Sequence, residues 1–187
     1  MADNRRAPGG KPGRNQENVA LKVVRRPLAA GSEAGDTSTV VLDEVAKDII
    51  TQLQEDGRRS YSAIGRAVGL SEAAVRQRVR GLIDAGVIQI VAVSDPLRLG
   101  FGLVAFVAVK VNGDIKRVAD ALAAISEIDY VVLAAGRYDI FTEVVCEDNQ
   151  HLLRLLNNQI RTIPGVADLE TFISLGLHKQ TYTWGTR

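Results

Sequence analysis

The side chains best suited to chemistry belong to Arg76, Gln77 and Arg80, which recur on one side of a helical pattern in residues 70–88. Arginine and glutamine can form paired hydrogen bonds to base edges in the DNA major groove, and arginine also neutralises phosphate. The opposite stripe is apolar at helical spacing, with Val75, Val79, Leu82 and Ile83. The pattern predicts a helix that packs on one face and offers polar groups on the other. A surface helix with a solvated basic face is the alternative.

The predicted helix has recognisable ends. Ser71 is its expected N-cap, because a serine hydroxyl can accept a hydrogen bond from a main-chain N–H of the first turn. Gly86 can end the helix in the left-handed conformation. After it, residues 87–93 alternate as a strand does, which predicts a wing or linker strand.

Two further helical patterns precede this segment. One covers residues 43–56, ends at Gly57 and has apolar residues at Leu42, Val45, Ile49, Ile50 and Leu53. The next runs from Ser60 to Val68, and Gly69 makes a tight turn into the basic helix. Two short helices joined by a glycine-containing turn form a helix-turn-helix pattern. The candidate DNA-binding residues are Arg58, Ser60, Tyr61, Ser62, Arg66, Ser71, Arg76, Gln77, Arg78 and Arg80.

The second half of the chain alternates strands and helices. Strands are expected at 101–111, 130–134, 140–146 and from 166 or 168 to about 177, with helices after Asp114 and at about 149–163. The order β-α-β-β-α-β is that of a ferredoxin-like unit, in which both helices cover one face of a four-stranded antiparallel sheet. The other face carries apolar side chains, so we expect a partner sheet, most simply from a second copy of the chain.

The turn between the second and third strands, residues 134–139, offers a possible ligand site. Gly136 is expected to allow a sharp turn with free main-chain amides, and Asp139 places a carboxylate beside them. Together these groups could hold the carboxylate and ammonium of a free amino acid. The alternative is a tight turn in which the Asp139 side chain bonds to its own backbone.

The chain resembles the Lrp/AsnC family of leucine- and asparagine-responsive regulators over roughly residues 40–182. The matching residues are Leu42-Asp43, Asp56-Gly57-Arg58, Ile64, Val68-Gly69-Leu70-Ser71, Val75, Arg78-Val79, Leu82 and Gly86-Val87-Ile88. The resemblance implies double-stranded DNA as a partner and dimers that assemble into tetramers or octamers. It also implies an amino-acid effector bound between subunits at Leu133, Ala134, Gly136, Tyr138, Asp139 and Ile140.

We therefore expect an α+β protein with a winged helix-turn-helix domain followed by a ferredoxin-like domain. The expected segments are a disordered basic tail at 1–39, a DNA-binding domain at 40–94, a hinge at 95–100, an effector and oligomerisation domain at 101–182, and a tail at 183–187. The tail lies outside the resemblance. It could add phosphate contacts or be an inert leader.

Composition and charge limit the classes of protein to which the chain could belong. The net charge is +1, so overall charge neither favours nor excludes nucleic acid. The single cysteine, Cys146, excludes an internal disulfide and fits a reducing compartment, so a cytoplasmic, nucleoid-associated protein is expected. No apolar run reaches the ~20 residues of a membrane span. His151 and His178 lack metal-ligand spacing, and no catalytic motif is recognisable, so no cofactor, metal or enzymatic activity is expected.

Three functions remain open from the sequence. The first is a sequence-specific transcriptional regulator with an amino-acid effector. The second is a nucleoid-like architectural DNA-binding protein without an obligatory ligand. The third, an enzyme or sensor built on the ferredoxin-like half, is disfavoured because no catalytic constellation accompanies it.

Overall fold

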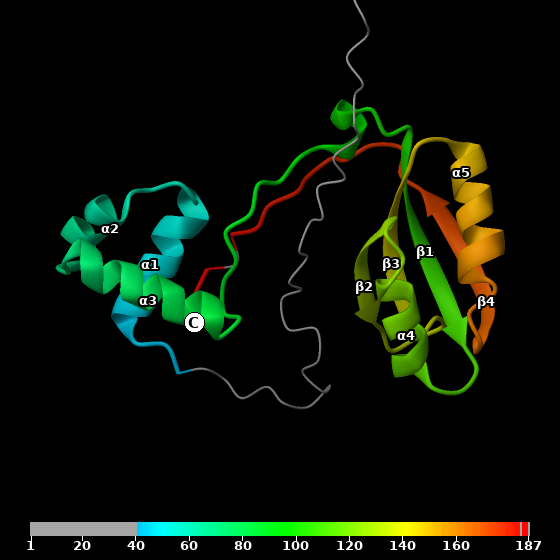
Figure 1. Ribbon diagram of the computed structural model, residues 1–187, viewed down its shortest axis with the longest axis horizontal. Helices are drawn as coiled ribbons and strands as arrows, with labels where there is room; N and C mark the ends of the chain where they lie inside the picture. Colours follow the sequence, from blue (N-terminus) through cyan, green and yellow to red (C-terminus); the bar gives the residue numbers. More distant parts are fainter. Residues whose placement is uncertain (1–40, 184, 187) are drawn as a thin grey trace, which may run out of the picture.

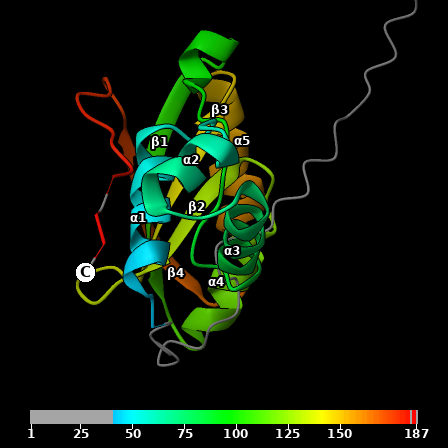
Figure 2. The ribbon, with the colours of Figure 1, turned by 90° about the vertical axis from the view of Figure 1, so that its left-hand side faces the viewer.

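The computed structural model describes residues 41–183, 185 and 186. The predicted tail at 1–39 and Trp184 lie outside the described residues. Figure 1 shows a helical domain and a sheet domain joined by an extended connection. Viewed from the helical side, the three N-terminal helices stand in front of the sheet (Figure 2). The predicted order of a helix-turn-helix domain and a ferredoxin-like domain is confirmed.

The first domain consists of α1 (Glu44–Glu55), α2 (Tyr61–Val68) and α3 (Glu72–Asp84). Each helix begins at a polar cap, because the side chains of Asp43, Ser60 and Ser71 accept hydrogen bonds from main-chain N–H groups three residues later. Gly69 and Gly86 adopt positive φ angles of 73° and 70°, as the turn and the helix end require. The core is formed by Ile49, Leu53, Ile64, Val75 and Val79, all buried.

The close packing of α2 against α3 depends on Gly65. A Cβ atom at this position would lie 2.5 Å from the main-chain oxygen of Leu70. Glycine therefore lets α2 approach the turn that leads into α3. This approach fixes the direction in which the polar face of α3 points.

The expected strand at 87–93 is wrong for this chain, since those residues have no regular secondary structure. A strand needs a neighbour to complete its hydrogen-bond ladder. Among the described residues, the paired strands are all in the C-terminal sheet. The connection contains instead a short 3-10 helix, η1 (Pro96–Leu99), capped by Asp95.

The second domain contains β1 (Leu103–Val111), α4 (Ile115–Ala123), β2 (Ile128–Leu133), β3 (Ile140–Cys146), α5 (Asn149–Arg154) and β4 (Val166–Ile173). The strands pair antiparallel in the order β2-β3-β1-β4. The predicted helix at 149–163 is divided, because α5 continues as a π-helical segment, η2 (Leu155–Ile160). The fourth strand ends at Ile173 rather than near residue 177, so His178 lies beyond it and does not end a strand.

One face of the sheet forms the core with the helices. Alternate residues of β3 (Ile140, Thr142, Val144 and Cys146) are fully buried and form the inward face of this strand. They pack with alternate residues of β1 and with Val118, Leu122, Leu155 and Ile160 from the helical layer. The other residues of each strand therefore point to the opposite, open face.

Candidate DNA-binding and effector sites

The exposed face of α3 carries Arg76, Gln77 and Arg80, while Val75, Val79 and Leu82 are buried beneath it. The NH2 nitrogen of Arg76 donates to a carboxylate oxygen of Glu72 at 2.6 Å. Its guanidinium carbon also lies 5.3 Å from the centre of the Tyr61 ring. Arg80 is held more loosely, with its Nε 3.7 Å from Asp84. The helix thus presents guanidinium and amide groups on one exposed face, and these are groups that can pair with base edges in the major groove.

Arg78, which the sequence placed among the DNA contacts, points toward another helix. Its NH1 nitrogen donates to both carboxylate oxygens of Asp43, at 3.0 and 2.7 Å. The hydrogen bond from Arg78, followed by that from the Ala46 N–H, holds the pKa of Asp43 below its ordinary value. Arg78 therefore links α3 to the start of α1.

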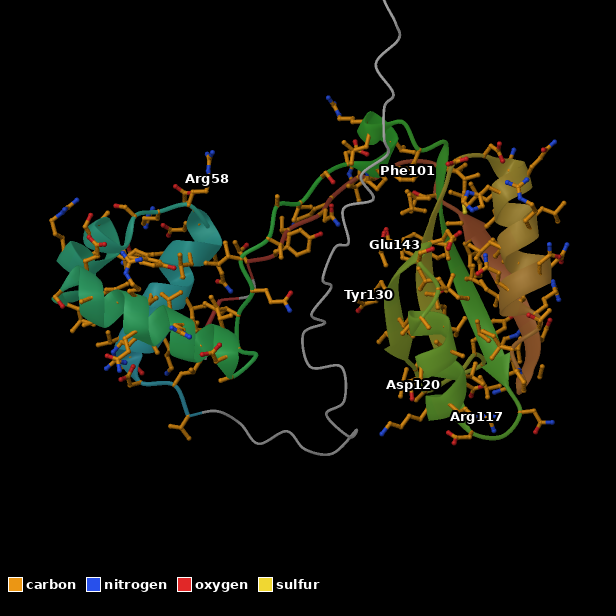
Figure 3. All side chains as sticks on the ribbon, viewed as in Figure 1. Arg58, Phe101, Arg117, Asp120, Tyr130 and Glu143 are labelled. Atoms are coloured by element: carbon orange, nitrogen blue, oxygen red, sulfur yellow. The ribbon has the colours of Figure 1, made fainter. Side chains whose placement is uncertain are left out.

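The remaining candidates lie at the ends of the helices. The hydroxyls of Ser60 and Ser71 serve as caps, and the Ser62 hydroxyl lies 3.3 Å from that of Ser60. Arg58 and Arg66 are exposed, and in the part of the chain that the structure describes neither has an ion-pair partner. Figure 3 shows Arg58 projecting outward from the loop between α1 and α2. These two arginines are accessible charges of the kind that contacts phosphate in protein–DNA complexes.

The turn between β2 and β3 is fastened to the end of β1. Asp139 donates its main-chain N–H to the oxygen of Val109. Its carboxylate accepts a hydrogen bond from the Val111 N–H at 2.8 Å and one from the Lys110 ammonium at 3.1 Å. The Val111 hydrogen bond, then that from Lys110, lowers the pKa of Asp139. The carboxylate of Asp139 thus bonds to β1, and among the described residues it makes no bond to the main chain of its own turn, which the alternative interpretation expected.

The same turn keeps main-chain donors available. Among the described residues, the N–H groups of residues 135–138 donate to no acceptor. The chain turns at Gly136 as expected, but the φ of this glycine is not positive, so its backbone conformation does not itself require glycine. Instead, a Cβ atom at Gly136 would meet nothing within 4 Å. The glycine therefore leaves open space beside the free amides.

Tyr138 was predicted as an effector residue, and the structure adds contacts that the sequence did not reveal. Its hydroxyl donates to Glu170 of β4 at 2.6 Å, and this hydrogen bond raises the pKa of Tyr138. Its ring meets that of Phe141 edge-on, with centroids 6.4 Å apart. Arg137 lies over the same ring at 5.4 Å. Tyr138 thus spans from the turn to the far edge of the sheet.

The other predicted effector residues differ in exposure. Leu133 is exposed, whereas the side chain of Ile140 is completely buried in the domain core. Ile140 can therefore reach a ligand only through its main chain. Ala134 is half-buried, and its N–H donates to the oxygen of Asp139, closing the turn.

The face of the sheet opposite the helices is apolar and partly exposed. It carries Phe106 on β1, Tyr130 on β2, Phe141 on β3 and Phe172 on β4, each 37–58% exposed. Figure 3 shows Tyr130 projecting from the side of β2 that faces away from α5. Glu143 lies between Phe106 and Tyr130 in register, and burial, followed by the charge of Asp129, raises its pKa. Residues 93–97 and the C-terminal segment cover this hollowed face only in part.

The side chains that could take part in catalysis or metal binding, such as His151 and Cys146, are held within the fold. His151 bonds to Glu127 at 3.2 Å and accepts a hydrogen bond from the Glu147 N–H, so both of its ring nitrogens have partners within the fold. Cys146 is buried, and burial raises the pKa of its thiol. Within the described residues, no group of three or more His, Cys, Asp or Glu side chains is arranged for a metal ion. Across those same residues, no helix is long and apolar enough to cross a membrane.

A helix-turn-helix domain with an exposed basic face, joined to a ferredoxin-like domain, defines a class of DNA-binding transcriptional regulators. A family model described as the AsnC-type helix-turn-helix domain matches residues 42–83. A second, described as the Lrp/AsnC ligand binding domain, matches residues 104–184. The chain belongs to the Lrp/AsnC family of transcriptional regulators.

Curated relatives support this assignment. An uncharacterised HTH-type transcriptional regulator of Pyrococcus horikoshii is 38% identical over 145 residues, covering 76% of this chain and 92% of that protein. The regulator FL11 of the same organism is 38% identical over 144 residues, with coverage of 76% and 95%. The proline dehydrogenase transcriptional activator of Rhizobium radiobacter is 29% identical over 153 residues, with coverage of 79% and 98%. These names are those of transcriptional regulators rather than enzymes.

Solved structures agree with the fold. AsnC of E. coli has a TM-score of 0.63 at 25% identity, and the match covers 76% of this chain and 97% of that chain. A transcriptional regulator of Neisseria meningitidis, solved as a complex with L-Met, has a TM-score of 0.65 at 24% identity, with coverage of 75% and 94%. The second likeness shows the fold alone.

Proposed function

We propose that this regulator acts in the cytoplasm as a homo-oligomer that binds specific DNA sequences, and that a free amino acid bound between subunits controls it. The observation that carries the assembly and effector parts of this proposal is the partly exposed apolar face of the sheet. The turn of residues 134–139, with its unused main-chain N–H groups, belongs to the same domain. We assign DNA binding to residues 40–94, the hinge to 95–100, and assembly and effector binding to 101–182.

A second copy of the chain is the occupant that best fits the open face. Aromatic residues from four adjacent strands lie on it, and burying them stabilises association. A twofold axis would set the same face against itself, as a symmetric dimer requires. The two α3 helices would then reach successive major grooves, so the sites should be imperfect palindromes.

For DNA binding, we assign base reading to Arg76 and Gln77 and phosphate contacts to Arg58 and Arg66. Arg78 is left out because Asp43 holds it away from this role. Ser60, Tyr61, Ser62, Ser71 and Arg80 surround the same surface. Arg76→Ala and Gln77→Ala should therefore reduce specific affinity more than non-specific affinity. Arg58→Ala and Arg66→Ala should weaken both and reduce the salt dependence of binding.

For the effector, the carboxylate of an amino acid would bind the free N–H groups of residues 135–138. Leu133 and Tyr138 would border its side chain, and Ala134, Asp139 and Ile140 would support the turn. A Neisseria meningitidis regulator of the same fold was solved with L-Met, which makes an amino acid the natural candidate. Such a ligand would act by binding one assembly more tightly than another.

The experiment is fluorescence anisotropy with DNA from upstream of the protein's own gene and with scrambled DNA, over a range of salt concentrations. A panel of amino acids is added in turn. Preference for the upstream DNA that changes with one amino acid supports the proposal. Equal affinity for both DNAs with a steep salt dependence would instead indicate an architectural DNA-binding protein.

The effector site has its own test in Gly136→Val. A Cβ atom there would meet nothing within 4 Å, so the fold should persist while the valine fills the space beside the amides. Gly176→Val is the matched control, because its Cβ also meets nothing within 4 Å. Loss of the amino-acid response in the first variant alone supports the site. A retained response would place the ligand elsewhere. Asp139→Ala is a less clean test, since it also removes the bond to Val111.

A further inference from the structure

Arg76 is the α3 cation that two other side chains hold in place. Glu72, one helical turn earlier, pairs with its guanidinium at 2.6 Å. Tyr61, the first residue of α2, places its ring 5.3 Å from the guanidinium carbon. The contacts come from two different helices, so the position of Arg76 depends on how α2 and α3 pack.

The Tyr61 ring is itself fixed by the domain core. It is half-buried and packs against the cluster that includes Ile64 and Val75. Glu72 stands in the first turn of α3, where the positive end of the helix stabilises a carboxylate. Both partners of Arg76 are therefore held by the fold. Arg80 is held less firmly, because its Nε is 3.7 Å from Asp84 and no aromatic ring of the described residues lies over it.

We propose that Glu72 and Tyr61 position Arg76 to read a guanine, and that Glu72 also reads a cytosine amine on an adjacent base pair. This inference rests on the proposed function of α3 as the DNA-reading helix. Guanine presents two acceptors in the major groove that match a guanidinium, and cytosine presents an amine that a carboxylate can accept. One oxygen of Glu72 binds Arg76, which leaves the second for the base.

The spacing supports neighbouring base pairs. Residues four apart in a helix are separated by about 6 Å along its axis. Successive base pairs are about 3.4 Å apart. The helical rise alone spans nearly two base-pair steps, but the guanidinium of Arg76 and the carboxylate of Glu72 meet at 2.6 Å, so the ends of the two side chains can contact adjacent pairs.

The pairing also affects discrimination against other DNA. An unpaired surface arginine can bind phosphate anywhere along the duplex, which raises non-specific affinity. The charge of Glu72 offsets that of Arg76 and repels phosphate. The Glu72–Arg76 pair therefore adds little affinity for the DNA backbone. It adds more affinity for two neighbouring base pairs that offer acceptors to Arg76 and an amine to Glu72.

The test begins with the full-length protein and a randomised DNA library, from which bound sequences are recovered and base preference is measured at each position. Wild-type protein should select a guanine next to a cytosine in each half-site. In Glu72→Gln, the preference for cytosine over other bases at that position should fall by about tenfold. This variant should also bind scrambled DNA more tightly, with a steeper salt dependence.

Variants of Tyr61 separate positioning from packing. Tyr61→Leu keeps an apolar side chain in the core but removes the ring, so the guanine preference should weaken while the melting temperature changes little. Tyr61→Phe keeps the ring and should restore the guanine preference. Glu55→Gln is the matched control for charge, because Glu55, the last residue of α1, also pairs with an arginine four residues later, Arg59 in the loop before α2.

The outcomes are distinguishable. If wild-type protein selects no sequence, the proposed function fails. If it selects a site, but Glu72→Gln leaves both the base preferences and the salt dependence unchanged, the inference about Glu72 is overturned alone. Equal changes in Glu55→Gln would also overturn it, because the effect would then follow net charge.

Discussion

Replacing Phe106 tests whether the open sheet face joins two copies of the chain. Phe106 lies in the middle of β1, opposite Glu143 of β3 and Phe172 of β4. Its 44% exposure leaves ring surface that a partner sheet would cover. We expect Phe106→Ala to weaken the dimer without unfolding the monomer, because the helix-facing core does not include this residue.

The size of the effect follows from area. A phenylalanine presents on the order of 200 Å², so an exposure of 44% leaves roughly 90 Å² for a partner to cover. At about 25 cal/mol per Å², this area contributes about 2 kcal/mol. A twofold dimer counts the residue twice, giving about 4 kcal/mol, or about a thousandfold in the dimer Kd. Alanine retains part of the contact, so a loss of about a hundredfold or more is expected.

Sedimentation velocity over a range of protein concentrations measures the Kd. Leu153→Ala is the control, because Leu153 is 59% exposed but lies on α5, in the layer that covers the opposite face. An unchanged Kd for Phe106→Ala would refute the assignment of this face. An equal loss in Leu153→Ala would place the interface on the helical layer instead.

Three further predictions concern stability and pH. The pKa of Glu143 is raised above its ordinary 4.5, and a sheet that covers this residue should raise the pKa further. Dimerisation should therefore take up a proton and become stronger as pH falls through that pKa. Glu143→Gln should strengthen the dimer at neutral pH and flatten the pH dependence of its Kd, as measured by sedimentation velocity. The pKa of Asp43 is held below its ordinary 3.8, so its pair with Arg78 stabilises the fold above that pH and is lost as pH falls through the lower folded value. Arg78→Ala should lower the melting temperature at neutral pH and reduce the further loss in acid, as followed by circular dichroism. Ile64→Ala, at a fully buried site, should cost about 2–5 kcal/mol in urea unfolding, and an unaffected midpoint would contradict the described helical core.

Local features of the fold were predictable because they depend on neighbouring residues. Ser60, Ser71 and Asp114 were recognisable as caps or helix starts from the sequence, and each accepts a main-chain hydrogen bond three residues later. The alternation of residues 140–146 puts Ile140 and Thr142 on one face of the strand, and the structure shows that this face is buried. The same alternation should have argued against an Ile140 side chain in the effector site.

Contacts between residues that are far apart in the chain could not be predicted from the sequence. Arg78 and Asp43 are 35 residues apart, and Tyr138 meets Glu170 at a separation of 32. No periodicity connects such pairs, because only the packed fold brings them together. The pairing of Glu72 with Arg76 is different. Its four-residue spacing on a helix is a sequence feature that could have been used.

The separation of the two cores limits how an effector could control DNA binding. The core of the helix-turn-helix domain and that of the sheet domain share no residue. Residues 87–95, an extended part of the connection between them, contain no regular secondary structure. Such a tether transmits little through packing within one chain. A ligand at the turn of residues 134–139 would therefore act by changing how sheet domains assemble. Assembly in turn sets the distance between α3 helices, which must match DNA half-sites whose centres are about 34–36 Å apart.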